Sequence, residues 1–229
     1  MSGTLRTGVL ARLRGARSTR DEGAAAVEFA LVSLLLITLF LGIIEFSLIL
    51  RDKVAVTSAV RAGGRIASAE PRQQPYAAGT FQANATGTPT TVTGLVVDAV
   101  FAVATNATGI PRTSISEVWV YRADANGFPQ SGSFATCGTD CVRYKYDAAF
   151  KWNDPTNGGA QVTGGFKYQS GTWLYTSINA CAGEQQSVGV YLKVDHPYLF
   201  GRFGSGTIGI NDASVFRFEP VPSNPGPCK

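Results

Sequence analysis

The sequence predicts an α+β protein: a long N-terminal transmembrane helix followed by a small domain with an antiparallel sheet of about four strands and a short helix. Three observations predict this class. Residues 24–50 are almost entirely apolar, residues 95–104 repeat apolar side chains at helical spacing, and four later runs have the composition of strands. The 229 residues can hold one ordinary domain plus an accessory segment, and the 45% hydrophobic content excludes a disordered polar chain.

Residues 1–23 are expected to be a cytoplasmic leader that does not belong to the mature fold. They show no apolar periodicity, and their first twenty residues hold five arginines: Arg6, Arg12, Arg14, Arg17 and Arg20. Because positively charged residues favour the cytoplasmic side of a membrane, we expect the N-terminus inside and the bulk of the chain outside.

A long helix is predicted over residues 24–69, membrane-spanning in its first half. Residues 24–50 carry only two charges, Glu28 and Glu45, and would cover about 40 Å as a helix, more than the roughly 30 Å of a bilayer core. Small apolar residues continue the helical spacing beyond the membrane. Pro71 disfavours helical geometry in the residue before it, so the helix should end at Ala69, and Gly63-Gly64 is its expected soft point.

The rest of the chain divides into a linker loop, residues 70–94, and an extracytoplasmic α+β domain, residues 95–229. The linker is rich in Pro, Gly, Thr and Gln, which is typical of surface loops. Residues 95–104 are predicted as a short helix, with a strand as the alternative because many of them are β-branched. The predicted strands are Ile115–Arg122, Val142–Trp152, Ser187–Val194 and Ala213–Phe218.

Charge and residue types argue against several functions. The net charge of +4 is more than accounted for by the five leader arginines, so no nucleic-acid partner is expected. Catalysis is not expected either, because the one histidine, His196, lies next to Pro197 and is interpreted as a surface or turn residue. The aromatic residues are more simply explained as core than as a binding face. No cofactor is expected.

Four cysteines, all C-terminal to the apolar segment, predict two disulfides in an oxidising compartment. A zinc site is disfavoured because a second closely spaced pair is missing, and no metal is expected. Three pairings are possible. The preferred one joins Cys137 to Cys141 across a short loop and Cys181 to Cys228 at the proline-rich tail, while the alternatives that involve Cys137 and Cys181 stay open.

A carboxylate inside the apolar segment needs an explanation, because ionisable residues in membrane helices are costly and usually functional. A cleaved secretory signal fits poorly, since the nearest A-x-A pattern begins well beyond Leu50. Gly23-Ala24-Ala25-Ala26-Val27-Glu28-Phe29, after an Arg-rich leader and before a long apolar helix, resembles the processing site of type IV prepilins. The whole pattern resembles TadE-like minor pseudopilins of the tight adherence (Flp, type IVc) pilus system, and the final strand Ser214–Pro220 resembles theirs more loosely.

The resemblance implies a processed, non-enzymatic subunit. Gly23 and Ala24 would be the pair cut by a prepilin peptidase, Glu28 the fifth mature residue that sets subunit register, and Phe29 the start of the packing helix. The major Flp subunit is a poor candidate, because its members are far smaller and carry Tyr where this chain has Phe29. The implied partners are the peptidase, other pilus subunits or assembly-platform proteins, and membrane lipid. The alternative is a permanently anchored single-pass ectodomain that binds a ligand or surface.

Overall fold

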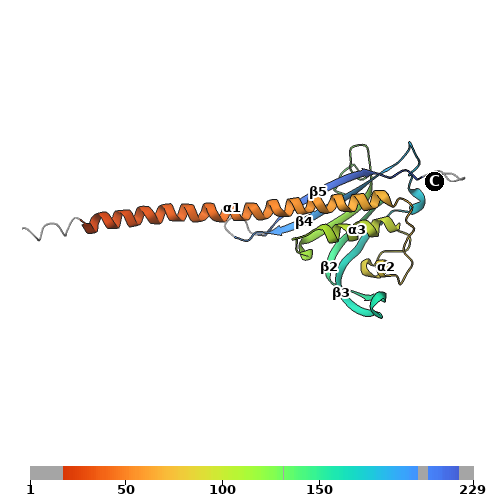
Figure 1. The fold of residues 1–229 in the computed structure, drawn as a ribbon, viewed down its shortest axis with the longest axis horizontal. Helices are drawn as coiled ribbons and strands as arrows, with labels where there is room; N and C mark the ends of the chain where they lie inside the picture. Colours follow the sequence, from red (N-terminus) through yellow and green to blue (C-terminus); the bar gives the residue numbers. More distant parts are fainter. Residues whose placement is uncertain (1–17, 131, 201–205, 222–229) are drawn as a thin grey trace, which may run out of the picture. The chain divides into compact units, whose positions relative to one another are not determined.

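The computed structural model describes residues 18–130, 132–200 and 206–221 (Figure 1). The chain divides into two compact units, residues 1–47 and residues 48–229. The first unit contributes the N-terminal part of helix α1, Ser18–Ala69, and the second begins within the same helix and contains all the other elements. Helix α1 ends at Ala69, as predicted.

Five antiparallel strands form one sheet in the described part of the second unit. They are β1 (Ile115–Ala123), β2 (Cys141–Asp154), β3 (Ala160–Thr172), β4 (Ser187–Pro197) and β5 (Thr207–Arg217). Their order across the sheet is β3-β2-β1-β4-β5. The α+β class is therefore confirmed, and the four predicted strands correspond to β1, β2, β4 and β5. Strand β3 was not predicted; it is an edge strand that pairs with β2 along most of its length.

Residues 70–94, predicted as a linker loop, contain helix α2 (Phe81–Thr86) and are tied to the sheet. The Thr80 hydroxyl caps α2 by accepting the Ala83 N–H at 3.4 Å, and Gly87 ends it in the left-handed region at φ 60°. A chain of hydroxyl hydrogen bonds then runs from Thr86 through Thr88 to Tyr144 on β2, at 2.6 and 2.7 Å. Short 3₁₀ turns also occur at Arg112–Ser114, Pro155–Asn157 and Tyr175–Ser177.

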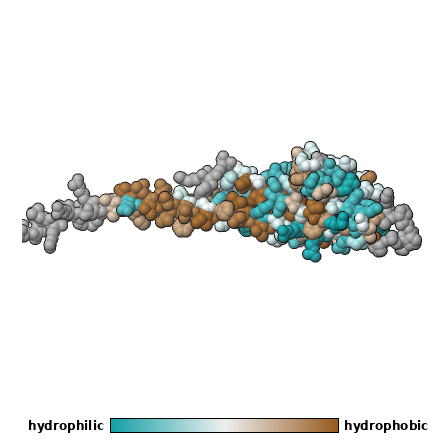
Figure 2. Space-filling model, turned by 90° about the horizontal axis from the view of Figure 1, so that it is seen from above, coloured by the Kyte–Doolittle hydropathy of each residue, from teal (hydrophilic) through white to brown (hydrophobic). Residues whose placement is uncertain are grey.

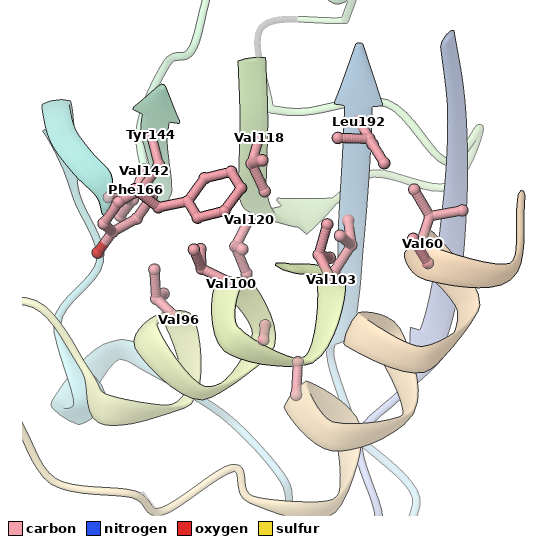
Figure 3. Packing of buried hydrophobic residues seen from close by; sticks show 14 of the residues in the cluster. Val60, Val96, Val100, Val103, Val118, Val120, Val142, Tyr144, Phe166 and Leu192 are labelled. Carbon is pink, nitrogen blue, oxygen red and sulfur yellow. The ribbon is translucent and has the colours of Figure 1, made fainter. Parts of the chain in front are cut away.

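The main core lies between one face of the sheet and two helices. Helix α3, Gly94–Asn106, realises the predicted short helix, and its buried valines point at the sheet (Figure 3). The C-terminal half of α1 adds Val56, Ala59 and Val60 to the same core. The labelled residues of this core are Val60, Val96, Val100, Val103, Val118, Val120, Val142, Tyr144, Phe166 and Leu192. Burial of this apolar surface is what holds the two helices against the sheet.

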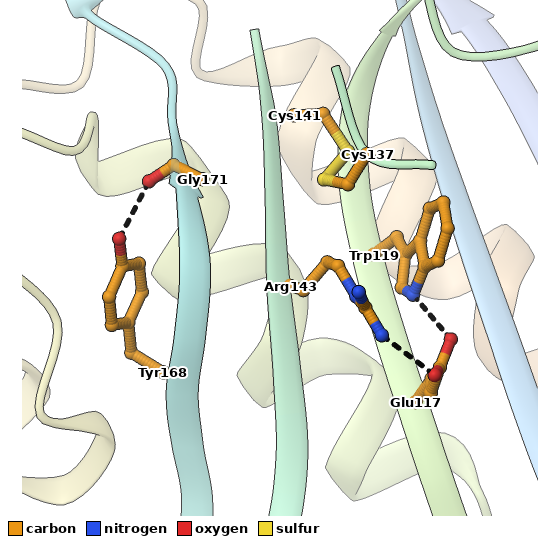
Figure 4. Close-up of a disulfide and its surroundings, with 7 residues drawn as sticks. All are labelled: Glu117, Trp119, Cys137, Cys141, Arg143, Tyr168 and Gly171. Atoms are coloured by element: carbon orange, nitrogen blue, oxygen red, sulfur yellow. Dashed lines mark hydrogen bonds and ion pairs between the residues drawn. A yellow bond between two sulfur atoms is a disulfide. The ribbon is translucent and has the colours of Figure 1, made fainter. Parts of the chain in front are cut away.

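The opposite face of the sheet carries a smaller aromatic cluster. Trp119 and Tyr121 of β1 point to this face, because residues on a strand alternate sides, and they pack with Phe134 and Tyr191. Glu117 accepts hydrogen bonds from the Trp119 indole and the Arg143 guanidinium, each at 2.8 Å (Figure 4). These aromatic side chains fill the domain interior, which agrees with the core interpretation.

Candidate functional site on the N-terminal helix

The first unit presents a continuous apolar helix surface. Most of the large hydrophobic side chains between Val27 and Phe46 are exposed, with Phe29 at 74% of its possible surface. The most apolar stretch has a mean hydropathy of 2.6, and none of it is buried. Figure 2 shows this stretch as a brown, hydrophobic surface. Such a helix is long and apolar enough to cross a membrane, and among the described residues it is the one helix that is.

The predicted processing and assembly residues lie at the N-terminal end of this surface. Gly23, Ala24, Glu28 and Phe29 are all exposed in α1, and a side chain added at Gly23 would meet nothing within 4 Å. Glu28 lies four residues after Ala24, one turn of about 6 Å along the axis, so both project from the same helix face. No hydrogen bond or ion pair joins Glu28 to another described residue. Its carboxylate is therefore available to a partner outside the chain.

A buried polar contact lies just beyond the apolar stretch of α1. The Asp52 carboxylate lies 2.7 Å from His196 Nδ1, within hydrogen-bond distance. It also forms an ion pair with the Arg51 guanidinium at 3.1 Å. Arg51 in turn donates to the Gly109 carbonyl at 3.3 Å. His196 is only 6% exposed, so its interpretation as a surface or turn residue is wrong. It does lie at the end of β4, as predicted, but the strand end packs against α1 and covers it.

Two glycines allow α1 to approach the rest of the domain closely. A Cβ on Gly63 would lie 2.7 Å from Val103 of α3, and a Cβ on Gly64 would overlap the Phe216 ring of β5. Helix α1 runs through both glycines without interruption, as the prediction of one helix over residues 24–69 requires. Because glycine has no side chain, the α1 backbone can approach α3 at Gly63 and β5 at Gly64 closely.

The solvent side of α1 in the second unit is basic and shallowly grooved. A groove of about 500 Å³ is lined in part by Lys53, Arg61 and Arg65. Lys53 pairs with Asp212 of β5 at 3.3 Å. The pKa of Asp212 lies below its ordinary value: burial opposes this, but hydrogen bonds from Thr57 and Ala213 and the charge of Lys53 outweigh it. Arg61 and Arg65 make no ion pair with another described residue.

A carboxyl pair marks the C-terminal end of α1. Asp98 of α3 accepts a hydrogen bond from the Tyr76 hydroxyl at 2.8 Å and interacts with Glu70. Burial raises the pKa of Asp98, and burial together with the negative charge of Asp98 raises the pKa of Glu70. Burial and the same carboxylate raise the pKa of the Tyr76 hydroxyl, which therefore stays a donor. Among the described residues, no three His, Cys, Asp or Glu side chains form a group that could hold a metal ion.

The predicted short disulfide is present. Cys137 and Cys141 are bonded, with their Cα atoms 5.4 Å apart, next to the aromatic face of the sheet (Figure 4). Cys181 is also disulfide-bonded. Its predicted partner, Cys228, lies outside the described residues, so the pairing of these two cysteines stays a prediction.

The comparison with protein families gives a match over the same part of the chain that carries the candidate site. The model of the family described as TadE-like protein matches residues 23–65. No curated protein and no solved structure matches the chain. The matched segment begins at Gly23, contains Glu28 and Phe29, and ends four residues before the end of α1. The resemblance predicted from the N-terminal residues is thereby confirmed, and over residues 23–65 this chain carries a TadE-like segment.

Proposed function

We propose that the protein is a minor pilin-like subunit of a tight adherence pilus system, acting in assembly rather than as an enzyme. The observation that carries this proposal is the TadE-like match over an exposed apolar helix with a carboxylate at Glu28. An exposed surface of this kind is stable only in lipid or against other apolar helices. Neighbouring pilus subunits or assembly-platform proteins offer such helices, and the membrane holds the chain before it joins them.

The proposed topology places the leader in the cytoplasm and the folded domain outside. The arginines of the leader support this orientation through the positive-inside rule. The disulfides support it as well, because they persist in oxidising compartments outside the cytoplasm. A prepilin peptidase at the cytoplasmic membrane face would then reach Gly23-Ala24 at the start of the apolar helix.

The experiment that tests the proposal is the identification of the mature N-terminus. We expect the chain co-expressed with an active prepilin peptidase to begin at Ala24, as measured by intact mass and N-terminal sequencing. Gly23→Val should remain uncut, because the added side chain alters the residue at the scissile bond. Gly15→Val, which makes the same change inside the leader, is the matched control and should be cut normally.

The control for the enzyme is a catalytically inactive peptidase, with which every variant should keep Met1 or its neighbour as the first residue. An uncut wild-type chain in the presence of active peptidase would contradict processing. It would favour the permanently anchored ectodomain instead.

A further inference from the structure

The second half of α1 packs one side on the domain core and presents the other side to solvent. On the solvent side, Val54 and Ile66 are 69% and 40% exposed, and Arg61 and Arg65 are exposed as well. All four residues belong to the second unit. This surface is therefore defined within the folded domain alone.

Two rows of side chains with a four-residue spacing follow the exposed side. Residues four apart are neighbours along a helix, and such rows form the ridges and grooves by which helices pack together. The first row contains apolar and small side chains, namely Val54, Ser58, Ala62 and Ile66. The second row lies beside it, offset by three residues, and contains Thr57, Arg61 and Arg65.

Two adjoining grooves lie over these rows. One has a volume of about 500 Å³, the other about 590 Å³, and both are lined by Ala62 and Arg65. The second groove also includes Ile66 and extends to Arg217 of β5. Because Ser58 and Ala62 are small, another helix can approach the α1 backbone closely between the larger side chains.

The charge of this surface is not neutralised by the part of the chain that the structure describes. The guanidinium groups of Arg61, Arg65 and Arg217 form no ion pair or hydrogen bond with a described residue. Glu219 is the one acidic residue that lines either groove, and it pairs with none of them. Arg61 and Arg65 are also one turn apart, and like charges at this spacing destabilise a helix. An acidic partner would remove this repulsion.

We propose that the exposed side of α1 docks an amphipathic helix of another protein, which packs along the row from Val54 to Ile66 and pairs carboxylates with Arg61 and Arg65. Carboxylates four residues apart on that helix match the spacing of the two arginines, and a guanidinium can bind a carboxylate through two parallel hydrogen bonds. The row is about 18 Å long at 1.5 Å per residue, which accommodates roughly three helical turns.

A second copy of this chain does not suit the site through the same face. Two-fold packing of α1 against itself would bring Arg61 and Arg65 of both copies together, and like charges across an interface oppose association. We therefore assign the docked helix to a different protein. The inference rests on the proposed function only in the expectation that this protein is another pilus component.

Site-specific photocrosslinking of the full chain, in cells that natively produce it, tests the docking. A diazirine amino acid replaces Ile66 in one variant. In the control it replaces Phe128, which is 38% exposed and packs on the aromatic cluster of the opposite sheet face. At position 66 we expect a crosslink that mass spectrometry places in a helical segment with Asp or Glu residues three or four apart.

Three crosslinking results would overturn the proposal. The first is a yield at position 66 no higher than at position 128. The second is a crosslink to lipid or to a second copy, which would mean that the groove has a different occupant. The third is a crosslink to a segment without such acidic residues.

Charge reversal tests whether the arginines hold the partner. Arg61→Glu/Arg65→Glu should lower the crosslinking yield at position 66 by more than about tenfold, because like charges then face each other across the interface. Lys145→Glu/Lys167→Glu is the matched control, since it changes the net charge equally at two exposed lysines that oppose each other on β2 and β3. The control should crosslink like the wild type, and an equal loss in both variants would overturn the site.

A neutral variant guards against misfolding. Arg61→Gln/Arg65→Gln removes the charges without adding carboxylates, and its thermal unfolding should match the wild type because neither arginine belongs to the core. Its crosslinking yield should fall, though less than that of the charge reversal. A wild-type yield would overturn the charge pairing.

Co-purification with pilus subunits, measured in the same cells, separates this inference from the proposed function. Normal co-purification without a crosslink at position 66 would refute the docking surface alone. A charge-dependent crosslink to an acidic helix outside the pilus system, with no pilus subunit co-purified, would support the docking surface and contradict the proposed function.

Discussion

At the scale of single residues, Glu70 and Asp98 make the stability of the domain depend on pH. Both carboxyl groups have pKa values raised by burial above their ordinary values of 4.5 and 3.8. The folded state thus binds protons more tightly than the unfolded state, so the stabilising contribution is full below the ordinary values. It is lost as the pH rises through the raised, folded-state values.

We therefore expect the unfolding midpoint of the wild type to fall as the pH is raised above about 4.5 through this range. Asp98→Asn keeps an acceptor for the Tyr76 hydroxyl but removes the charge, so its midpoint should fall less. Thermal unfolding of the detergent-solubilised protein at a series of pH values measures this. Asp124→Asn, in a turn outside the cluster, is the control, and a variant at position 98 with the wild-type pH profile would contradict the assignment.

His196 shows where residue-level prediction fails. The sequence places it next to a proline at a strand end, and both features are correct, yet its environment is buried. The reason is that its partner, Asp52, lies 144 positions earlier in the chain and reaches it only through the packing of α1 on the sheet. The one local signal for this contact is an aspartate two residues after the apolar run, and that signal does not identify His196 as the partner of Asp52.

At the scale of elements, the close packing of α1 depends on Gly64. Gly64→Val would force side-chain atoms into the Phe216 ring, and overpacking of this kind costs about 1–3 kcal/mol of unfolding free energy. Gly and Val differ by less than about 0.5 kcal/mol in helix propensity, so packing should dominate. Ala62→Val is the control, because Ala62 lines an open groove on the same helix. Chemical denaturation of both variants measures the difference, and equal stabilities would refute the packing role.

The Cys137–Cys141 disulfide should contribute modestly to stability. It encloses only three residues, and closing so short a loop is worth about 2 kcal/mol in the chain-entropy model. The double variant Cys137→Ala/Cys141→Ala should therefore remain folded, with its unfolding free energy lowered by about that amount. Denaturation without reductant, which keeps the bond made by Cys181, measures the change. Complete loss of the folded state would show that this bond is instead essential.

Elements with strong local patterns could be predicted, and those set by long-range pairing could not. Alternating apolar residues predicted β1 and β4, and the valine stripe predicted α3. Strand β3 escaped because it is an edge strand with three glycines, two of them in positive-φ conformations at 87° and 100°, which interrupt its alternation. Helix α2 escaped because its six residues are too few for a helical period to show.

At the scale of the whole molecule, the TadE-like segment could be predicted because it depends on consecutive residues. Length, lack of charge and the order of Gly23, Ala24 and Glu28 are all visible in the sequence. The structure adds that the last part of the matched segment is also a core element, since Val56, Ala59 and Val60 are buried against the sheet. The same helix is therefore long and apolar enough to cross a membrane in one unit, and it stabilises the folded domain in the other.

The last prediction concerns the role of Glu28 in assembly, which involves a single residue, its helix and the neighbouring subunits. An isolated carboxylate in a membrane helix costs free energy, so Glu28 needs a partner. Cleavage after Gly23 would create one, because the new α-amino group of Ala24 has a reference pKa near 8 and is largely cationic at neutral pH. At a separation of 4 Å in a partly apolar setting, such a pair interacts by up to about 4 kcal/mol before desolvation. Only a pair formed between subunits would specify their register.

We therefore expect Glu28→Ala to insert into the membrane normally but to lose most of its co-purification with other pilus subunits. Membrane fractionation and affinity co-purification measure the two properties separately. Ser33→Ala is the matched control on the same exposed helix, since the Ser33 hydroxyl bonds only to the Ala30 carbonyl within its own helix among the described residues. If Glu28 instead extends to the headgroups without a protein partner, Glu28→Ala should co-purify like the wild type, and its proposed role would be wrong. Glu28→Gln separates charge from shape: loss of assembly in this variant as well assigns the effect to the carboxylate charge.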